Sequence, residues 1–398
     1  MTAKKLLTRT AVVTAALLMV TCELVTIMAA ANGNGPRATA PGNTGSAPAA
    51  PAAETAPLLP AAEVIDLPVE FEVVNRNRTA SQCTSDGKPY TLRGHLTAPR
   101  SLLETAAEGG DGAPAVTLYV HGTNTGEWVW RLDPPGPRAG LTHELARRGH
   151  ASVSIDRLGY GASDIPDGFA SCSGAHADMA HQIVQQLRSG AYTAEDTPGA
   201  PDGRPRFDRV FLAGHSSGAL VAETVAASFD GAVDGLLLTG WAAVGVTGET
   251  NRRFLAAYAV CQQGGEPKDK AGDPKGYVHF DPVREDFLAG GFGPGTDPEV
   301  LADVAPLWPR NPCGVMASEP AGILTDLQLI GRIDTPVFLA FGAEDILRQG
   351  VEGYPALFTA SDDVKTVTLA DSGHFVTLDQ DAARLQDEID RWLDTHMS

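Results

Sequence analysis

Residues 209–224 read Arg-Val-Phe-Leu-Ala-Gly-His-Ser-Ser-Gly-Ala-Leu-Val-Ala-Glu-Thr. The stretch opens with an apolar run at 210–213 and continues into an apolar helical pattern at 219–227. Between them, residues 214–218 match the pattern G-x-S-x-G, in which two glycines permit a strand to turn sharply into a helix. The pattern therefore predicts that Ser216 is held on a strained corner with its hydroxyl accessible. An ordinary tight turn with a solvated serine is the alternative.

Outside this stretch, short apolar runs alternate with helical patterns. The predicted strands lie at 68–74, 90–98, 115–120, 151–155, 210–213, 235–239, 337–341 and 365–369. The predicted helices lie at 141–148, 175–187 and 379–396. This alternation predicts an α/β fold in which helices cover both faces of a mostly parallel central sheet. Ligands of such sheets bind beyond the carboxyl ends of the strands, so site residues should follow directly after strands.

The alternation stops between about Trp241 and Ile333, where no run resembles a core strand. We predict that residues 242–333 form a largely helical cap, inserted between two parts of one core at 63–241 and 334–398. Its helical patterns lie at 253–262, 298–305 and 321–330. Its apolar side chains could line a pocket or pack on the core, and they include Phe254, Tyr258, Phe287 and Leu307.

The first 62 residues do not resemble a folded domain. Three basic residues precede an apolar run at 11–20, and small residues follow at 29–31. This order predicts a secretory signal peptide at 1–31, and hence a secreted protein without stable membrane association after cleavage. A retained membrane anchor and lipidation of Cys22 are the alternatives. Residues 32–62 are rich in Ala, Pro and Gly, which predicts a flexible linker.

The charge balance narrows the classes of partner. The formal net charge is −19, and removal of the predicted signal peptide takes away three positive charges and one negative charge, which leaves −21. A strongly acidic protein repels the phosphate backbone, so nucleic acid is not expected as a partner. The sequence gives no indication of the oligomeric state.

Four cysteines remain after the predicted signal peptide: Cys83, Cys172, Cys261 and Cys313. Four cysteines allow three sets of pairings. Because the last two lie inside the predicted cap and the first two lie outside it, we favour Cys83–Cys172 and Cys261–Cys313. Free buried thiols are the alternative, which an oxidising compartment disfavours. The cysteine and histidine spacings indicate no metal site, and we expect no cofactor.

The candidate catalytic residues all follow predicted strands. A serine hydroxyl needs a base to accept its proton, and the base needs an anion to orient it. His374 follows the last strand and is the candidate base, and Asp345 follows the preceding strand and is the candidate acid. Glu344 and Asp371 are the rival acids. The chain order of serine, acid and base is the order expected for this triad on a parallel sheet.

An oxyanion formed at the reacting carbonyl needs backbone donors. One donor should be the N–H of Ser217, directly after the nucleophile. The second should come from the loop after the 115–120 strand, where the N–H of Thr123 is best placed and Asn124 or Thr125 is the alternative. Trp128 and Trp130 follow this loop and could bind the acyl group of a substrate, although packing is as good an explanation.

Taken together, these motifs resemble those of the α/β-hydrolase fold superfamily, in its serine esterase and lipase branch. The similarity covers about residues 90–395 apart from the insertion, which lies where many members carry a helical cap. Residues 156–163 also resemble a turn motif that is common in this fold. The resemblance implies a serine nucleophile rather than the aspartate of the dehalogenase and epoxide hydrolase branches.

The sequence therefore predicts a serine hydrolase that cleaves a carboxylic ester or lactone through an acyl-enzyme on Ser216. The expected partner is a small-molecule substrate. An acyltransferase that uses the same acyl-enzyme is the main alternative, and hydrolysis of carbon–carbon or amide bonds is also compatible. A non-catalytic binding protein on this scaffold is disfavoured because the triad is complete.

Overall fold

A computed structural model describes residues 63–109, 112–133, 140–195, 200–268 and 270–397. The predicted signal peptide and the predicted linker lie outside these residues. Within the described part of the chain, no helix combines the length and the apolar character that a membrane crossing requires.

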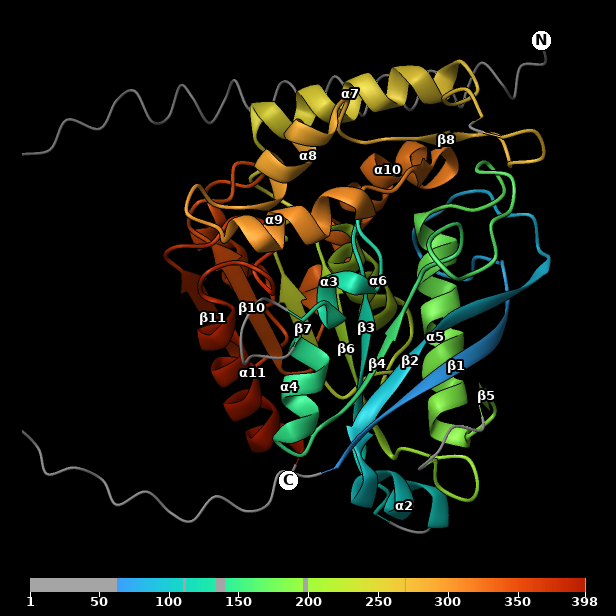
Figure 1. Cartoon of the computed structure of the whole chain (residues 1–398), viewed down its shortest axis with the longest axis vertical. Coiled ribbons are helices and arrows are strands. Elements are labelled where there is room, and N and C mark those ends of the chain that lie inside the picture. The colour runs from blue at the N-terminus through green and yellow to red at the C-terminus, as the bar shows by residue number, and fades with distance from the viewer. Residues whose placement is uncertain (1–62, 110–111, 134–139, 196–199, 269, 398) are drawn as a thin grey trace, which may run out of the picture. The chain divides into compact units, whose positions relative to one another are not determined.

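A single large sheet forms the centre of the fold (Figure 1). Its strands are β1 (Val64–Val74), β2 (Pro89–Pro99), β3 (Ala115–Val120), β4 (Ala151–Ile155), β5 (Thr193–Ala194), β6 (Arg209–His215), β7 (Leu236–Thr239), β10 (Val337–Gly342) and β11 (Val364–Leu369). Among the described residues the strand order is β11-β10-β7-β6-β3-β4-β2-β1-β5. All pairs from β11 to β4 are parallel, whereas β2, β1 and β5 are antiparallel. The predicted mostly parallel sheet is confirmed.

Helices cover both faces of this sheet. Side chains of a strand alternate between the faces, and in β3 Leu118 joins one buried apolar cluster while Tyr119 joins the other. The first cluster includes residues of α5 (Ser173–Ser189) and α6 (Ser217–Ser228). The second includes residues of α4 (Leu141–Arg147) and α11 (Ala382–Met397). The short helix α2 (Arg100–Glu108) follows β2 and adds Leu103 and Ala106 to the first cluster.

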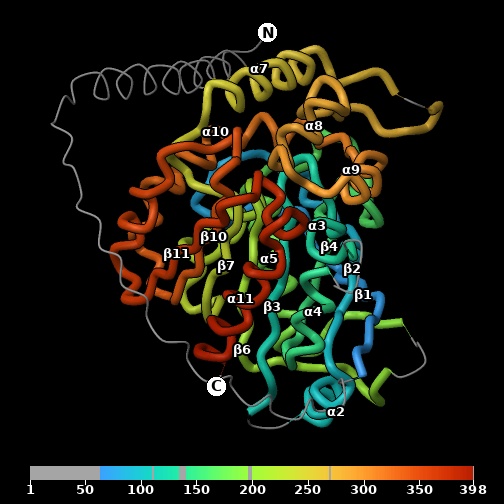
Figure 2. Tube along the Cα trace, turned by 60° about the vertical axis from the view of Figure 1, so that its left-hand side comes forward, coloured from blue at the N-terminus to red at the C-terminus, as the bar shows by residue number. Residues whose placement is uncertain are grey.

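The segment between β7 and β10 is largely helical, as predicted, and residues 242–333 are called the cap below. Its elements are α7 (Gly248–Gln262), β8 (Tyr277–Val278), α8 (Arg284–Gly291), α9 (Pro298–Val304), η1 (Ala305–Leu307), β9 (Asn311–Pro312), α10 (Cys313–Leu329) and η2 (Ile330–Arg332). Figures 1 and 2 show its helices at the end of the sheet where β3 runs towards α3 (Trp128–Arg131). This is the end at which the parallel strands finish.

Both predicted disulfide pairings are confirmed. The Cα atoms of Cys83 and Cys172 lie 6.1 Å apart, and this bond ties the β1–β2 connection to the start of α5. The Cα atoms of Cys261 and Cys313 lie 5.3 Å apart. The second bond lies wholly within the cap, where it joins the end of α7 to the start of α10.

Candidate active site

Ser216 occupies the turn between β6 and α6. Its backbone has φ 52° and ψ −126°, and within the described residues only Asn124 is another non-glycine residue with positive φ. The turn depends on close backbone approach, since a Cβ added to Gly214 would lie 2.4 Å from the carbonyl oxygen of Gly218. A Cβ added to Gly218 would lie 2.3 Å from the carbonyl oxygen of Val120. Strained non-glycine residues concentrate at functional sites, which fits the position of this serine.

His374 and Asp345 form a buried hydrogen-bonded pair. Nδ1 of His374 lies 2.7 Å from Oδ2 of Asp345, and both side chains are 4% exposed. The other carboxylate oxygen of Asp345 accepts a hydrogen bond from the Leu347 N–H at 2.7 Å. The rival acids Glu344 and Asp371 are exposed, and in the described structure neither forms a hydrogen bond or an ion pair with His374. A carboxylate on Nδ1 fixes the imidazole tautomer that leaves Nε2 free to accept a proton.

His215 connects the serine turn to this pair. Its ring centroid lies 4.8 Å from that of His374, and its Nε2 lies 3.1 Å from the His374 carbonyl oxygen. Burial, followed by the charge of His374, holds the pKa of His215 well below its usual value, so the ring is neutral. Between the described residues Ser216 and His374 there is no hydrogen bond. In unliganded enzymes catalytic hydrogen bonds are often long and shorten only when substrate binds.

The loop after β3 approaches the serine closely. A Cβ added to Gly122 would lie 2.8 Å from Cβ of Ser216. The Thr123 N–H, the predicted oxyanion donor, donates to Oγ of Ser217 at 2.8 Å. Ser217 begins α6, so its own N–H belongs to the unpaired first turn of that helix. Thr123 can therefore hold an oxyanion only after the Ser217 hydroxyl has turned away from it.

Hydrogen bonds connect the cap to the loop after β3. The Asn124 N–H donates to Oδ1 of Asn311 at 2.7 Å, and the Asn124 side-chain amide donates to Asp281. Arg253 of α7 donates to the same carboxylate, and both members of this ion pair are at most 3% exposed. The N–H groups of Thr123 and Asn124 are thus both bonded in this structure, that of Thr123 to a hydroxyl and that of Asn124 to the buried side chain of Asn311. The sequence patterns did not single out Asp281, Asn311 or Arg253.

Glu319 extends from α10 of the cap to the same loop. Its Oε1 accepts a hydrogen bond from Oγ1 of Thr123 at 2.7 Å, and the Thr123 hydroxyl lies 2.8 Å from the Ser217 hydroxyl. Burial raises the pKa of Glu319 above its usual value. The cap thus brings an acid to the predicted oxyanion donors. Nothing in the sequence signalled this contact, which spans 196 positions.

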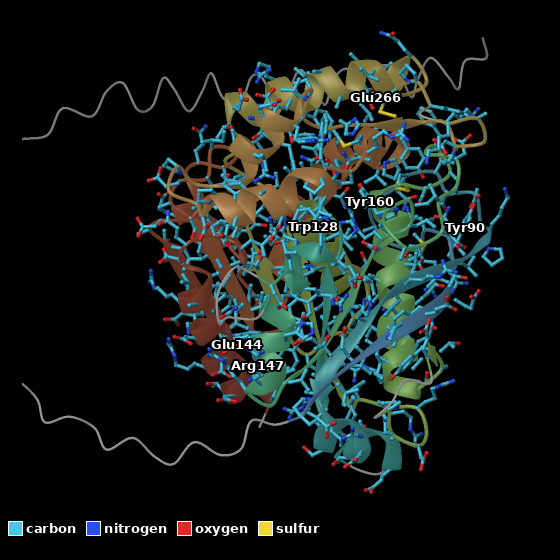
Figure 3. All side chains as sticks on the ribbon, in the orientation of Figure 1. Tyr90, Trp128, Glu144, Arg147, Tyr160 and Glu266 are labelled. Atoms are coloured by element: carbon cyan, nitrogen blue, oxygen red, sulfur yellow. A yellow bond between two sulfur atoms is a disulfide. The ribbon has the colours of Figure 1, made fainter. Side chains whose placement is uncertain are left out.

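The two candidate substrate-binding tryptophans occupy different environments. Trp130 is 0% exposed, and its ring packs edge-on against His215 at a centroid distance of 6.2 Å. Its side chain therefore supports the serine turn from the core and has no surface for a substrate. Trp128 is half-buried and packs edge-on against Phe287 of the cap and Phe375. Figure 3 shows Trp128 below the cap helices.

Comparison with known proteins identifies the family to which the chain belongs. A family model described as the alpha/beta hydrolase family matches residues 118–387, which is more than half of the chain. The chain belongs to the alpha/beta hydrolase family. No curated protein sequence matches the chain.

Three solved structures share the alpha/beta hydrolase fold of this chain. A thermophilic esterase from Thermogutta terrifontis has 18% identity and a TM-score of 0.56, with 82% of this chain and 100% of that chain covered. An enol-lactonase from Burkholderia xenovorans has 16% identity and a TM-score of 0.54, with 77% of this chain and 97% of that chain covered. A monoacylglycerol lipase from Paleococcus ferrophilus has 17% identity and a TM-score of 0.52, with 71% of this chain and 94% of that chain covered. At these identities the likeness shows the fold alone.

One group in the described residues of this alpha/beta hydrolase has the spacing of metal ligands. It comprises His150, Asp390 and Asp394. His150 directly precedes β4, so the group lies at the amino end of the strands, away from Ser216. Nε2 of His150 lies 2.9 Å from Oδ1 of Asp390, which an ordinary hydrogen bond explains. The group has no connection with the candidate triad.

Proposed function

We propose that this protein is an exported serine hydrolase that cleaves a carboxylic ester or a lactone. The observation that carries the proposal is the 2.7 Å contact between His374 and Asp345, at the sheet edge that also holds the strained Ser216. Family membership supports hydrolytic chemistry. The esterase, lactonase and lipase that share the fold act on the same class of bond, and this also supports the proposal.

In the proposed reaction, Oγ of Ser216 attacks the carbonyl carbon while Nε2 of His374 accepts the hydroxyl proton. Asp345 keeps the imidazole oriented and stabilises its positive charge. The N–H groups of Ser217 and Thr123 hold the oxyanion of the tetrahedral intermediate. The carbon–oxygen bond to the alcohol then breaks as His374 returns the proton to the leaving oxygen. Water, deprotonated by His374, attacks the acyl carbon, releases the acid and restores Ser216.

The first test is hydrolysis of p-nitrophenyl esters of graded acyl length by the mature protein and by Ser216→Ala. We expect the variant to lose roughly 10⁴-fold or more in kcat/KM while its circular dichroism is unchanged. Ser189→Ala, an exposed serine on α5, is the matched control and should retain full activity. Substantial turnover by Ser216→Ala would remove the serine mechanism. A fluorophosphonate that labels the wild type but not this variant provides a second readout.

Export belongs to the same proposal. It is supported by the two disulfides, which persist in oxidising compartments. Expression in a host with a secretion pathway should deliver to the medium a protein whose N-terminus lies near residue 32. N-terminal sequencing of that material is the measurement. A cell-associated protein that keeps its first residues would contradict export and favour a membrane anchor.

The cap is proposed to cover the site and to limit it to small or medium substrates. This is supported by the contacts that Asp281, Asn311 and Glu319 make with the loop after β3. The graded ester series tests the idea, because a covered site should show an optimum at short or medium acyl chains. Activity that increases steadily up to long-chain esters would contradict it.

A further inference from the structure

Arg348 forms no direct ion pair with an acid in the described part of the chain. It lies between β10 and η3 (Val351–Leu357), three residues after Asp345. Its guanidinium carbon lies 4.5 Å from the ring centroid of Trp241. Its Nε is buried and has no acceptor among the described residues, and none of the ion pairs there includes it. An aromatic face attracts a cation but does not neutralise it.

Arg348 belongs to the surroundings of the proposed triad. Trp241 follows Gly240, and a Cβ added to Gly240 would lie 3.2 Å from the His374 ring. The charge of Arg348 also interacts with Asp345. The guanidinium therefore lies near residues that surround the acid and the base of the proposed triad.

The nearby acid of the cap does not serve as the missing partner. Glu319 also interacts with the charge of Arg348, but its carboxyl is fixed on Thr123 at 2.7 Å. A second guanidinium, that of Arg157, also acts on Glu319. Arg157 is 3% exposed and donates to the Gly122 carbonyl oxygen at 2.8 Å. Both guanidinium groups therefore act on Glu319, although the chain as a whole carries a net charge of −19.

The environment of Arg348 favours an anionic ligand. Burial lowers the pKa of Arg348, because the protein displaces water that would stabilise its charge. The residue nevertheless keeps some accessible surface, so part of the side chain can be reached. A partly desolvated cation that no acid pairs with directly is destabilising, and a bound anion reduces that penalty. The planar guanidinium matches a carboxylate, to which it can donate two parallel hydrogen bonds.

We propose that Arg348 binds a carboxylate of the substrate, so that the enzyme prefers esters or lactones carrying a free carboxylate near the scissile bond. This inference rests on the proposed function of Ser216. Arg348 has no part in the proton transfers, so its contribution should appear mainly in KM. The preferred substrates would include monoesters of short dicarboxylic acids.

Two matched pairs of chromogenic esters test the proposal. The first pair is mono-p-nitrophenyl glutarate and its methyl ester, which place the carboxylate on the acyl side. The second is 4-(butyryloxy)benzoate and its methyl ester, which place it on the leaving group. Wild type should favour the anionic member of at least one pair by about 10-fold or more in kcat/KM, as a charge-assisted hydrogen bond implies. High salt should reduce the preference.

The variants separate recognition from a structural role. Arg348→Met should abolish the preference through KM and change the neutral esters by less than about 3-fold, whereas Arg348→Lys should restore part of it. Arg252→Met is the control, because Arg252 is an exposed arginine of the cap that pairs with Glu249, and it should behave as wild type. The wild-type comparison alone decides the matter if the Met variant does not fold.

Three results would overturn the proposal. Ser216-dependent cleavage of neutral esters, with no preference for either anionic ester, would remove the carboxylate site and leave the proposed function intact. An equal loss on charged and neutral esters in Arg348→Met would assign Arg348 a structural role. The absence of both ester turnover and fluorophosphonate labelling of Ser216 would remove the proposed function and this inference together.

Discussion

The side-chain amide of Asn124 donates a hydrogen bond to the carboxylate of Asp281, which lies 157 positions further along the chain and belongs to the cap. Asn124 adopts φ 66° directly after the proposed oxyanion residue Thr123. A left-handed backbone costs an L-residue about 1–2 kcal/mol unless contacts stabilise it. The cap thus contributes two hydrogen bonds that support this conformation of the loop.

Replacing Asp281 by Ala should affect both stability and turnover. The change removes the buried carboxylate from the guanidinium of Arg253, which keeps its ion pair with Glu249, and should lower the free energy of unfolding by about 1–3 kcal/mol. It also releases Asn124, so kcat should fall roughly 10-fold while KM changes little. Thermal unfolding and steady-state kinetics measure the two effects. Glu285→Ala, an exposed acid of the cap, should change neither, and an unaltered kcat in folded Asp281→Ala would contradict loop positioning.

Asp345→Asn tests the acid of the triad. An amide does not hold the imidazole in the required tautomer, so kcat should fall by roughly 10⁴-fold while the fold is kept. Glu344→Gln provides the control, because Glu344 is adjacent in the chain but exposed. If Glu344→Gln loses activity and Asp345→Asn keeps it, the acid has been assigned to the wrong residue. Stopped assays with p-nitrophenyl butyrate are sensitive enough for both variants.

The sequence predicted most of the core because local patterns determine it. Buried strands appear as continuous apolar runs, and a parallel sheet brings their carboxyl ends to one edge. This is why the spacing alone could propose Ser216, Asp345 and His374, which the structure places directly after β6, within the loop after β10 and after β11. The disulfide pairing followed from the same division of the chain into core and insertion.

The contacts of the cap could not be read from local patterns. The sequence indicated a helix at 321–330, whereas α10 begins at Cys313 and carries Pro320 in its interior. A proline normally ends a helix, since it lacks the N–H donor, so the turns before it were not recognised. Glu319 lies in those turns. The helix α8 was also missed, because it has 8 residues and ends in two glycines.

The disulfide Cys261–Cys313 should support activity more than the disulfide Cys83–Cys172 does. It joins α7, which carries Arg253, to the start of α10, which directly follows the short strand of Asn311 and Pro312. Both Arg253 and Asn311 take part in holding the loop at Asn124. Replacing both of its cysteines by Ser should lower the free energy of unfolding by about 2–4 kcal/mol and reduce kcat in the folded protein.

Removing Cys83–Cys172 gives the matched comparison. That bond closes a longer loop, with a sequence separation of 89 against 52, and neither of its cysteines belongs to the cap. Its loss should therefore lower the free energy of unfolding at least as much as the loss of Cys261–Cys313 does. The kcat of the folded fraction should be unchanged. Equal kcat in the two double variants would show that the cap disulfide has no special role in the site.

A buried pair of acids should make stability depend on pH. Glu223 of α6 is 0% exposed and Asp326 of α10 is 3% exposed. Trp241 and Tyr354 donate to Glu223 at 2.9 and 2.6 Å, whereas the described residues offer Asp326 no donor other than a proton shared with Glu223. Burial raises the pKa of Asp326 to about 7 and that of Glu223 well above its usual value.

The sign of the effect follows from proton counting. Between about pH 4, where an unfolded acid titrates, and pH 7, the folded protein binds more protons than the unfolded chain. This contribution to stability is therefore fully present below pH 4 and is lost as the pH rises towards 7, by at most about 1.4 kcal/mol per pH unit for one proton.

Asp326→Asn removes one of the two titrations and offers Glu223 an amide donor. Its free energy of unfolding in urea should decline less steeply than that of wild type from pH 5 to 8, and Asp334→Asn, at an exposed position, should keep the wild-type slope. Parallel slopes for Asp326→Asn and wild type would show that the pair does not share a proton in the folded protein.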